Sequence, residues 1–221
     1  MRFRLTYEGE LKAGQKDPDD NQWDRMAEHK QAIRKVFHRQ LKHLWETNRF
    51  LREHEVFPTD YSTGRSAPND AARRSRSANE RLSLLQAVAG QYHENGYRFV
   101  PLVRDTMSLL CSLDILFLRR DIPGSVLTAG DLDNRIKTLI DALRKPKGAN
   151  ELRGNETPAA GEDPFFCLLE DDKSVSQFAV ESDALLDPPT GDKEADRRQV
   201  RIVITVEIRP YHVTMFNLSF A

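Results

Sequence analysis

The chain has little of several things, and each scarcity excludes a class of protein. Its 221 residues include only 2 Cys and 2 Trp. Cys111 and Cys167 fall in predicted buried strands, so we expect two reduced thiols in an intracellular protein rather than a disulfide. No Cys and His spacing matches a zinc site. The longest apolar run, residues 109–118, contains Ser112 and Asp114 and is too short to span a bilayer.

Targeting signals and repeats are also missing from the sequence. No apolar stretch follows residues 1–4, so we expect no secretory signal peptide. No internal repeat or low-complexity tract is evident. With 39% hydrophobic and 30% charged residues, the composition fits one polar domain over residues 1–221. We therefore predict a cytoplasmic protein that does not contact a membrane.

Net charge is nearly absent, because 33 Lys and Arg balance 34 Asp and Glu to give −1. That balance gives no sign of a nucleic-acid partner, but the distribution is uneven. Residues 30–81 hold 12 Lys or Arg against 6 Asp or Glu and carry +6, so the remainder carries −7. A basic segment on an acidic body is a candidate DNA-facing surface. Solvated helix faces explain the same charges equally well.

The most informative stretch is residues 130–143, GDLDNRIKTLIDAL. Its apolar residues recur at three- and four-residue spacing, which predicts a helix with one buried face: Ile136, Leu139, Ile140 and Leu143. Asp131 and Asp133 stand at its start, where carboxylates complement the exposed amides and the helix dipole. Lys137 and Asp141 follow Asp133 at four-residue intervals, so these three residues share a polar face.

About 30 residues further on, an apolar strand is predicted at Phe165–Leu169, and three consecutive acids, residues 170–172, follow it. Clustered carboxylates repel one another unless a cation holds them, and Mg²⁺ takes oxygen ligands. The predicted ligands are Asp131, Asp133 and Asp172. With Lys137 beside them, they would hold Mg²⁺ against a phosphodiester and activate a water. Each piece alone is usually structural, as helix caps or as a turn; their combination is more specific.

These residues together resemble the RusA family of Holliday-junction resolvases. The resemblance lies in Asp-Leu-Asp-Asn-x-x-Lys at 131–137, Asp-Ala-Leu at 141–143 and the apolar strand that ends in Asp-Asp. It covers roughly residues 97–209 and the first strand. It implies a small α/β fold, a homodimer, and cutting of four-way DNA junctions with Mg²⁺ or Mn²⁺, and therefore a nucleoid-associated protein. The family's required acids match Asp131, Asp133 and Asp172, its required lysine matches Lys137, and Asp171 matches the neighbouring acid.

Two features of the chain depart from that family. A basic run often precedes the motif, whereas residues 127–130 are Leu-Thr-Ala-Gly and the nearest basic pair is at 119–120. The chain also carries a long segment near its N-terminus, which we interpret as a basic, α-helical insertion at residues 18–95. The cations predicted to contact DNA are Arg73, Arg74, Arg76, Arg119, Arg120, Lys145, Lys147 and Lys173.

Periodicity over the rest of the chain predicts an α/β (α+β) fold. We expect a mixed, mainly antiparallel sheet with helix 130–143 packed on one face. Alternating apolar residues predict its strands, at 2–7, 97–102, 107–117, 175–181 and 200–208. A helix is also predicted from 18 to about 51, followed by a loop at 54–76. A second helix is predicted to begin with a capping box at Ser77 and Glu80 and to end at Asn95-Gly96. The apolar tail at 210–221 is predicted to dock on a partner or second subunit.

The predicted function is Mg²⁺-dependent hydrolysis of DNA phosphodiesters in branched DNA, in recombination, repair or a phage-related process. Bound metal would polarise the phosphate and lower the pKa of a water, and Lys137 would offset charge on the phosphoryl oxygens or on the leaving group. Asn134 would orient the ligands, and Asp171 is either a ligand or an orienting residue. The alternative is a DNA-binding or assembly subunit without catalysis.

Overall fold

The structure is a computed structural model that describes residues 1–14, 23–56, 81–120, 131–188, 191–192, 196, 198–214 and 216–221. The side chains of residues 23–25 and 131 are not among those described. Several predictions therefore lie outside the described residues. These are the DNA contacts of Arg73, Arg74 and Arg76, the capping box at Ser77 and Glu80, and most of the loop at 54–76.

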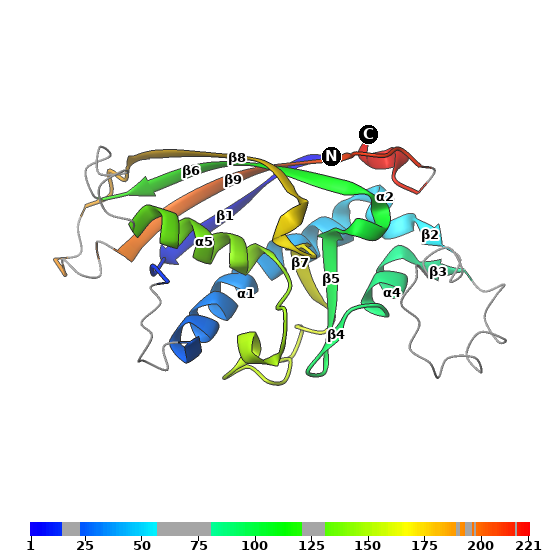
Figure 1. The fold of residues 1–221 in the computed structure, drawn as a ribbon, viewed down its shortest axis with the longest axis horizontal. Coiled ribbons are helices and arrows are strands. Elements are labelled where there is room, and N and C mark those ends of the chain that lie inside the picture. The colour runs from blue at the N-terminus through cyan, green and yellow to red at the C-terminus, as the bar shows by residue number, and fades with distance from the viewer. Residues whose placement is uncertain are drawn as a thin grey trace.

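A four-stranded sheet forms the larger layer, in the order β1-β9-β6-β8 (Figure 1). Its strands are β1 (Arg2–Glu10), β6 (Leu109–Arg119), β8 (Val175–Ala184) and β9 (Gln199–Pro210). β9 pairs antiparallel with β1 and with β6, whereas β8 runs parallel to β6. Every second residue of β6 from Leu109 to Arg119 is buried, so the alternation gives the sheet one apolar face. The predicted mixed, mainly antiparallel sheet is confirmed.

A smaller sheet holds the strand that carries the acidic turn. β5 (Tyr97–Val103) lies between β4 (His93–Glu94), antiparallel to it, and β7 (Phe165–Leu169), parallel to it. The turn between β4 and β5 is Asn95-Gly96, with φ of 47° and 78°. Two positive φ angles are what a two-residue hairpin turn requires. The prediction that Asn95-Gly96 closes a helix is therefore wrong, since it closes a hairpin.

Helices α1 (Trp23–Thr47) and α2 (Arg49–Glu53) replace the single long helix predicted for this region. The break falls at Asn48, whose side chain accepts the Leu51 N–H at 3.1 Å and so caps α2. The apolar stripe of α1 is buried as expected, including Ile33, Phe37 and Leu41. This helix therefore belongs to the core of the same domain.

The short helix α4 (Leu84–Ala89) begins later than predicted. Its capping box is Ser83 and Gln86: the Ser83 hydroxyl accepts the Gln86 N–H at 3.2 Å, and the Gln86 side chain accepts the Ser83 N–H at 3.1 Å. This exchange satisfies two amides that a helix start leaves without partners. Just before it, β3 (Leu82–Ser83) pairs with β2 (Glu55–Val56), so Leu82 is in a strand and not in a helix.

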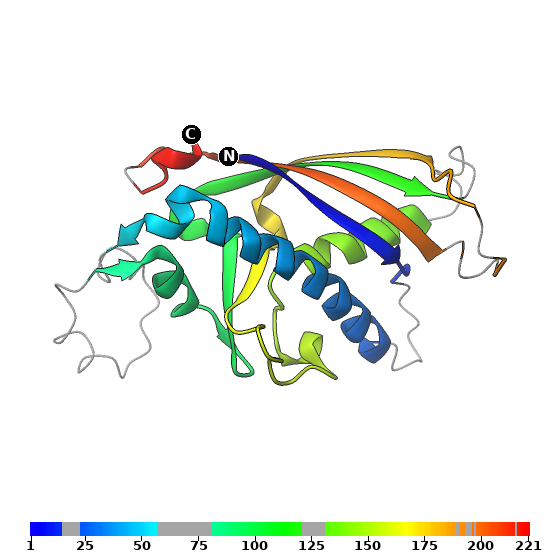
Figure 2. The same cartoon turned by 180° about the vertical axis from the view of Figure 1, so that it is seen from behind.

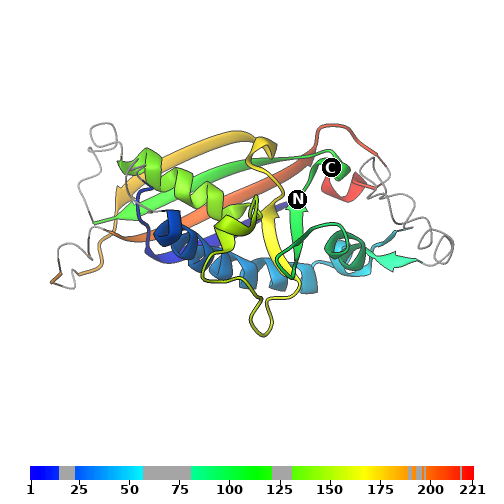
Figure 3. The ribbon, with the colours of Figure 1, turned by 60° about the horizontal axis from the view of Figure 1, so that its bottom comes forward.

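Helices α1 and α5 (Asp131–Leu143) cover one face of the four-stranded sheet and contact each other (Figures 1 and 3). Figure 2 shows α1 crossing beneath the sheet, with the smaller sheet beyond it. Buried residues of both helices and of the sheet form one cluster, for example Phe37, Leu139 and Ile204. The prediction that the motif helix packs on one face of the sheet is confirmed. No described helix is both long and apolar enough to cross a membrane.

The C-terminal tail docks partly on its own chain. Phe220 is 1% exposed, and its carbonyl and that of Ile208 accept the N-terminal amine of Met1 at 3.3 and 2.8 Å. The side-chain amide of Asn217 donates to the carbonyl of Met107 at 2.8 Å. Part of the tail's apolar surface is thus used internally, while Tyr211 and other apolar residues stay exposed.

Candidate functional site

The motif helix α5 turns two of the predicted site residues outward. Leu139 and Leu143 are fully buried, which fixes the orientation of the helix on the sheet. Asp133 and Lys137 are exposed, and they lie one turn apart on the opposite side. Within the described part of the chain, neither side chain forms a hydrogen bond or ion pair. Asn134 lies beside them, and its carbonyl accepts the Thr138 hydroxyl at 3.0 Å.

Asp141, the third residue of the predicted polar face, has a structural role instead. It accepts Lys30 of α1 at 2.5 Å and Arg144 at 3.0 Å. Burial by itself would raise the pKa of Asp141, but the hydrogen bonds and charges of Lys30 and Arg144 together hold that pKa below its ordinary value. The carboxylate therefore stays ionised and ties α5 to α1.

A buried ion-pair network extends from this residue. Arg34 of α1 is 1% exposed and donates to Glu151 at 2.8 Å, and Arg144 donates to the same carboxylate at 3.0 Å. Glu151 lies in the 3-10 turn η4 (Ala149–Leu152), so the network joins α1, α5 and the segment after α5. The sequence alone does not predict this network, because no periodicity reveals a pair 117 residues apart.

The acidic turn forms the second part of the candidate site. All five residues of β7 are buried, and the 3-10 turn η5 (Asp172–Ser174) follows that strand. The Asp171 carboxylate accepts the Lys173 N–H at 3.1 Å, and this hydrogen bond is the main cause of the lowered pKa of Asp171. The Lys147 amine lies 3.8 Å from the Asp171 carboxylate and 3.5 Å from that of Asp172. One exposed lysine thus partly balances both acids.

The two groups of acids lie at opposite ends of α5. The Lys145 N–H donates to the Leu169 carbonyl at 2.9 Å, which sets the end of α5 beside the end of β7 and the acidic turn. Asp133 stands at the start of the helix, and the rise from there to Leu143 is about 15 Å. Figures 1 and 3 show α5 starting near the ends of β6 and β8, away from β7.

This separation decides which predicted ligands meet within one chain. Magnesium binds oxygen ligands at about 2.0–2.1 Å, so one ion cannot contact Asp133 and Asp172 of the same chain in this arrangement. Among the described residues, no three or more His, Cys, Asp or Glu side chains group as metal ligands would. The Asp131 side chain lies outside the description, so the pair Asp131 and Asp133 remains a prediction.

The predicted DNA-contacting cations divide into buried, paired and exposed residues. Arg119 is 4% exposed and is therefore not a surface cation. Arg120 forms an ion pair with Asp196 at 2.6 Å and donates to two carbonyls, so it holds the end of the sheet. The Lys145 amine lies 5.9 Å from the centre of the Tyr92 ring. Lys147 and Lys173 are exposed near the acidic turn, and Lys173 pairs with Asp105 at 2.5 Å.

No family model, curated protein or solved structure matches this chain. The molecule is a mixed α+β protein. The exposed Asp133 lies at the start of α5, and the exposed Asp172 lies in the turn beside the end of that helix. Its residues and their geometry alone carry the functional proposal.

Proposed function

We propose that this protein is a Mg²⁺- or Mn²⁺-dependent endodeoxyribonuclease that cuts branched DNA, as the RusA-like motif implies. One observation carries the proposal. Asp133 and Lys137 are exposed side by side, and neither has a partner among the described residues, although Asp141 on the same helix is engaged in ion pairs. An exposed carboxylate without a partner suits a hard cation, and a lysine one turn away suits the phosphate that such a cation would bind.

The residues of α5 have distinct roles in this mechanism. Asp131 and Asp133 would supply carboxylate oxygens at the start of the helix, and Asn134 would keep them oriented. Bound Mg²⁺ would supply Lewis acidity toward the phosphate and lower the pKa of a water. Lys137 would place its ammonium against the phosphoryl oxygens, where charge builds up during hydrolysis.

The acids of the turn require a second chain in this proposal. Because α5 separates Asp172 from Asp133, one ion can contact both only if the two residues come from different subunits. A two-fold dimer meets this condition twice and presents two equivalent sites to a roughly symmetric junction. Asp171 and Asp172 of each subunit would then complete the site at the start of the other subunit's α5, with Lys147 turned toward the DNA.

The test uses two variants with the same chemical change. Asp133→Asn removes one negative charge from the candidate site, so it should abolish junction cleavage and leave junction binding equal or tighter. Asp114→Asn is the matched control, because Asp114 is exposed on the outer face of β6, opposite the helices. It should cleave like the wild type. Normal cleavage by Asp133→Asn would show that the catalytic assignment is wrong.

The alternative function, a DNA-binding or assembly subunit without catalysis, has one observation in its favour. The acids do not group around a common point among the described residues of a single chain. If the wild-type protein binds four-way junctions but no divalent cation supports cleavage, this alternative replaces the proposed function.

A further inference from the structure

Most of the described Lys and Arg side chains form an ion pair, a hydrogen bond or a ring contact, and a few do not. Lys137 of the candidate site is one of the exceptions. Among the described residues, the others are Arg2, Arg4, Arg39, Lys42 and Arg209. Lys42 is half-buried and the four arginines are exposed. A surface cation without an acid beside it is available to an anion from outside the chain.

These cations gather where α1 packs beside the β1 edge of the sheet (Figures 1 and 2). The side-chain amide of Gln40 joins the two elements, since it accepts the Thr6 N–H at 2.9 Å and donates to the Thr6 carbonyl at 2.7 Å. Arg4 is two residues from Thr6, on the same face of β1. Arg39 immediately precedes Gln40 on α1. The contact between Gln40 and Thr6 therefore sets cations of the strand beside cations of the helix.

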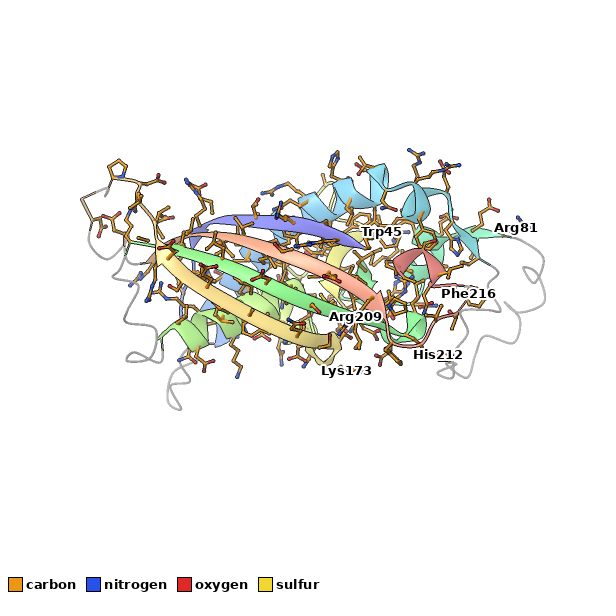
Figure 4. The ribbon with its side chains drawn as sticks, turned by 90° about the horizontal axis from the view of Figure 1, so that it is seen from above. Trp45, Arg81, Lys173, Arg209, His212 and Phe216 are labelled. Carbon is orange, nitrogen blue, oxygen red and sulfur yellow. The ribbon has the colours of Figure 1, made fainter. Side chains whose placement is uncertain are left out.

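The row of cations continues in both directions. Lys42 lies one turn after Arg39 on α1, and Arg2 follows Arg4 on the same face of β1. Figure 4 shows Arg209 on β9, at the end of the sheet where β1 begins. We call these five residues the basic band. They come from both ends of the chain and from α1, so the fold and not a local run of sequence brings them together.

Few acids offset the basic band. Glu207 on β9 and Glu46 on α1 lie beside it, yet neither forms an ion pair with a described residue. Glu8, on the same face of β1, is already paired with Arg201 at 3.1 Å. The band therefore carries an excess of positive charge, although the whole chain carries −1. Such a local excess attracts a polyanion.

We propose that the basic band binds the phosphate backbone of one duplex arm of branched DNA. DNA as the ligand rests on the proposed function, whereas the band itself does not. Arg2 and Arg4 are about 7 Å apart along β1, at about 3.3 Å a residue. This spacing matches the axial rise of two nucleotides in one strand of B-DNA, about 3.4 Å each. Contacts to phosphates position the duplex and do not read its sequence.

Two observations favour duplex DNA over other occupants of this surface. Among the described residues, no large apolar side chain is exposed on β1 or α1, so the band offers no platform on which single-stranded bases could stack. Gln40 occupies the hydrogen-bonding positions of Thr6, which disfavours the addition of a strand from another protein. A partner that presents only regularly spaced charge satisfies both conditions.

The basic band lies away from the candidate catalytic residues. Helices α1 and α5 start at the same end of the molecule and run in similar directions, and the Arg34 side chain donates to the Arg144 carbonyl at 3.3 Å (Figures 1 and 3). At about 1.5 Å a residue, the chain rises about 16 Å from Asp133 to Arg144 and about 8 Å from Arg34 to Arg39. The band thus begins roughly 25 Å from Asp133, the length of about seven base pairs. It would hold an arm of the junction at a distance from the cut.

The salt dependence of junction binding tests the band, and a chelator keeps cleavage out of the measurement. The double variant Arg4→Gln with Arg39→Gln should bind more weakly than the wild type. Its log–log salt slope should be shallower by about 1.8, because each phosphate contact contributes about −0.9. Between 50 and 200 mM salt, the variant should therefore lose about twelvefold less affinity than the wild type loses.

The matched control removes the same charge from arginines that already have an acidic partner. Arg49→Gln with Arg98→Gln is such a double variant, since Arg49 pairs with Glu53 at 2.9 Å and Arg98 pairs with Asp163 at 2.9 Å. Both arginines are exposed, so the substitutions match those in the band. This control should keep the salt slope of the wild type.

Hydroxyl-radical footprinting of the bound junction locates the contact. The wild type and the control should protect one arm about seven base pairs from the crossover, and the band variant should lose only that protection. An unchanged salt slope, or a wild type that leaves the arm unprotected, would overturn the proposal. Band-dependent binding without any metal-dependent cleavage would refute the proposed function and leave the band intact. Metal-dependent cleavage with an unchanged salt slope in the band variant would do the reverse.

Discussion

Removal of Glu151 should destabilise the fold more than any change to a surface ion pair. Its carboxylate accepts hydrogen bonds from Arg34 at 2.8 Å and from Arg144 at 3.0 and 3.1 Å. In Glu151→Ala, Arg34 would lose its ion pair and keep only neutral acceptors such as the Asp141 carbonyl, while Lys30 and Arg144 would share the Asp141 carboxylate. The Arg34 side chain is 1% exposed, so water cannot compensate its charge.

The size of the effect follows from this burial. Breaking a buried ion pair by removing one partner costs about 3–5 kcal/mol. Glu151 keeps 27% of its side chain exposed, which favours the lower end, about 3 kcal/mol. In a chain of this size each kcal/mol shifts Tm by about 2–4 °C, so the melting temperature should fall by about 6–12 °C. Burial by itself would raise the pKa of Glu151, but Arg144 and Arg34 lower it overall, so the lost group is a charged one at neutral pH.

Urea unfolding of three variants provides the assay. Glu151→Gln keeps the shape and one acceptor, so it should lose less stability than Glu151→Ala. Glu53→Gln is the control, since Glu53 forms an exposed pair with Arg49 four residues away and should change the midpoint little. If Glu151→Ala lowers the urea midpoint no more than Glu53→Gln does, the buried network does not stabilise the fold as described.

Three further predictions concern pH, metal and salt. The ring of His38 accepts the Phe166 N–H at Nδ1, 2.9 Å away, and burial is the main cause of its lowered pKa. Neutral His38 therefore contributes stability that is present above the ordinary histidine pKa of about 6.5 and is lost as the pH falls from there toward the lower pKa of the folded state. In urea unfolding, the His38→Gln variant should lose less unfolding free energy between pH 7.5 and pH 5 than the wild type loses. Millimolar Mg²⁺ or Mn²⁺ should raise the melting temperature, because only the native state assembles the proposed site; a melt unchanged by these ions and by Ca²⁺ would count against a metal site. Replacing Arg73, Arg74 and Arg76 together by Ala should weaken DNA binding and flatten its salt dependence, which is about −0.9 per phosphate contacted on a log–log plot, while the cleavage rate at saturating DNA changes little. An unchanged salt slope in that triple variant would indicate a solvated segment without phosphate contacts.

Local periodicity predicted the strands and helices that carry the core. The alternation of β6 and β9 and the helical spacing of α5 each depend only on which face is buried. Short signals were ambiguous, because one pattern serves two structures. Asn95-Gly96 favours positive φ, which suits a helix end and a hairpin turn equally. The capping-box spacing occurs at Ser77 and again at Ser83, and the sequence does not rank the two.

For the candidate site, local periodicity indicates which residues of α5 are exposed, but it does not indicate how far apart distant segments of the chain lie. The helical period identified Asp133 and Lys137 as surface residues of α5, and both are exposed. The distance between Asp133 and Asp172 depends on which end of α5 meets β7, and no local pattern contains that information. Arg119 is a different case, since strand alternation already places it on the same face as the buried Phe117. That signal in the sequence was sufficient to remove it from the surface cations.

The most direct test of the nuclease proposal is cleavage of DNA by the purified wild-type protein with and without divalent cation. A four-way junction and a linear duplex of the same sequence, each end-labelled, should be incubated with Mg²⁺, with Mn²⁺ and with a chelator. The proposal predicts cuts in the junction that need Mg²⁺ or Mn²⁺ and are much slower in the linear duplex. Cleavage that persists in the chelator, or a junction left intact with both cations while it is bound, would contradict it.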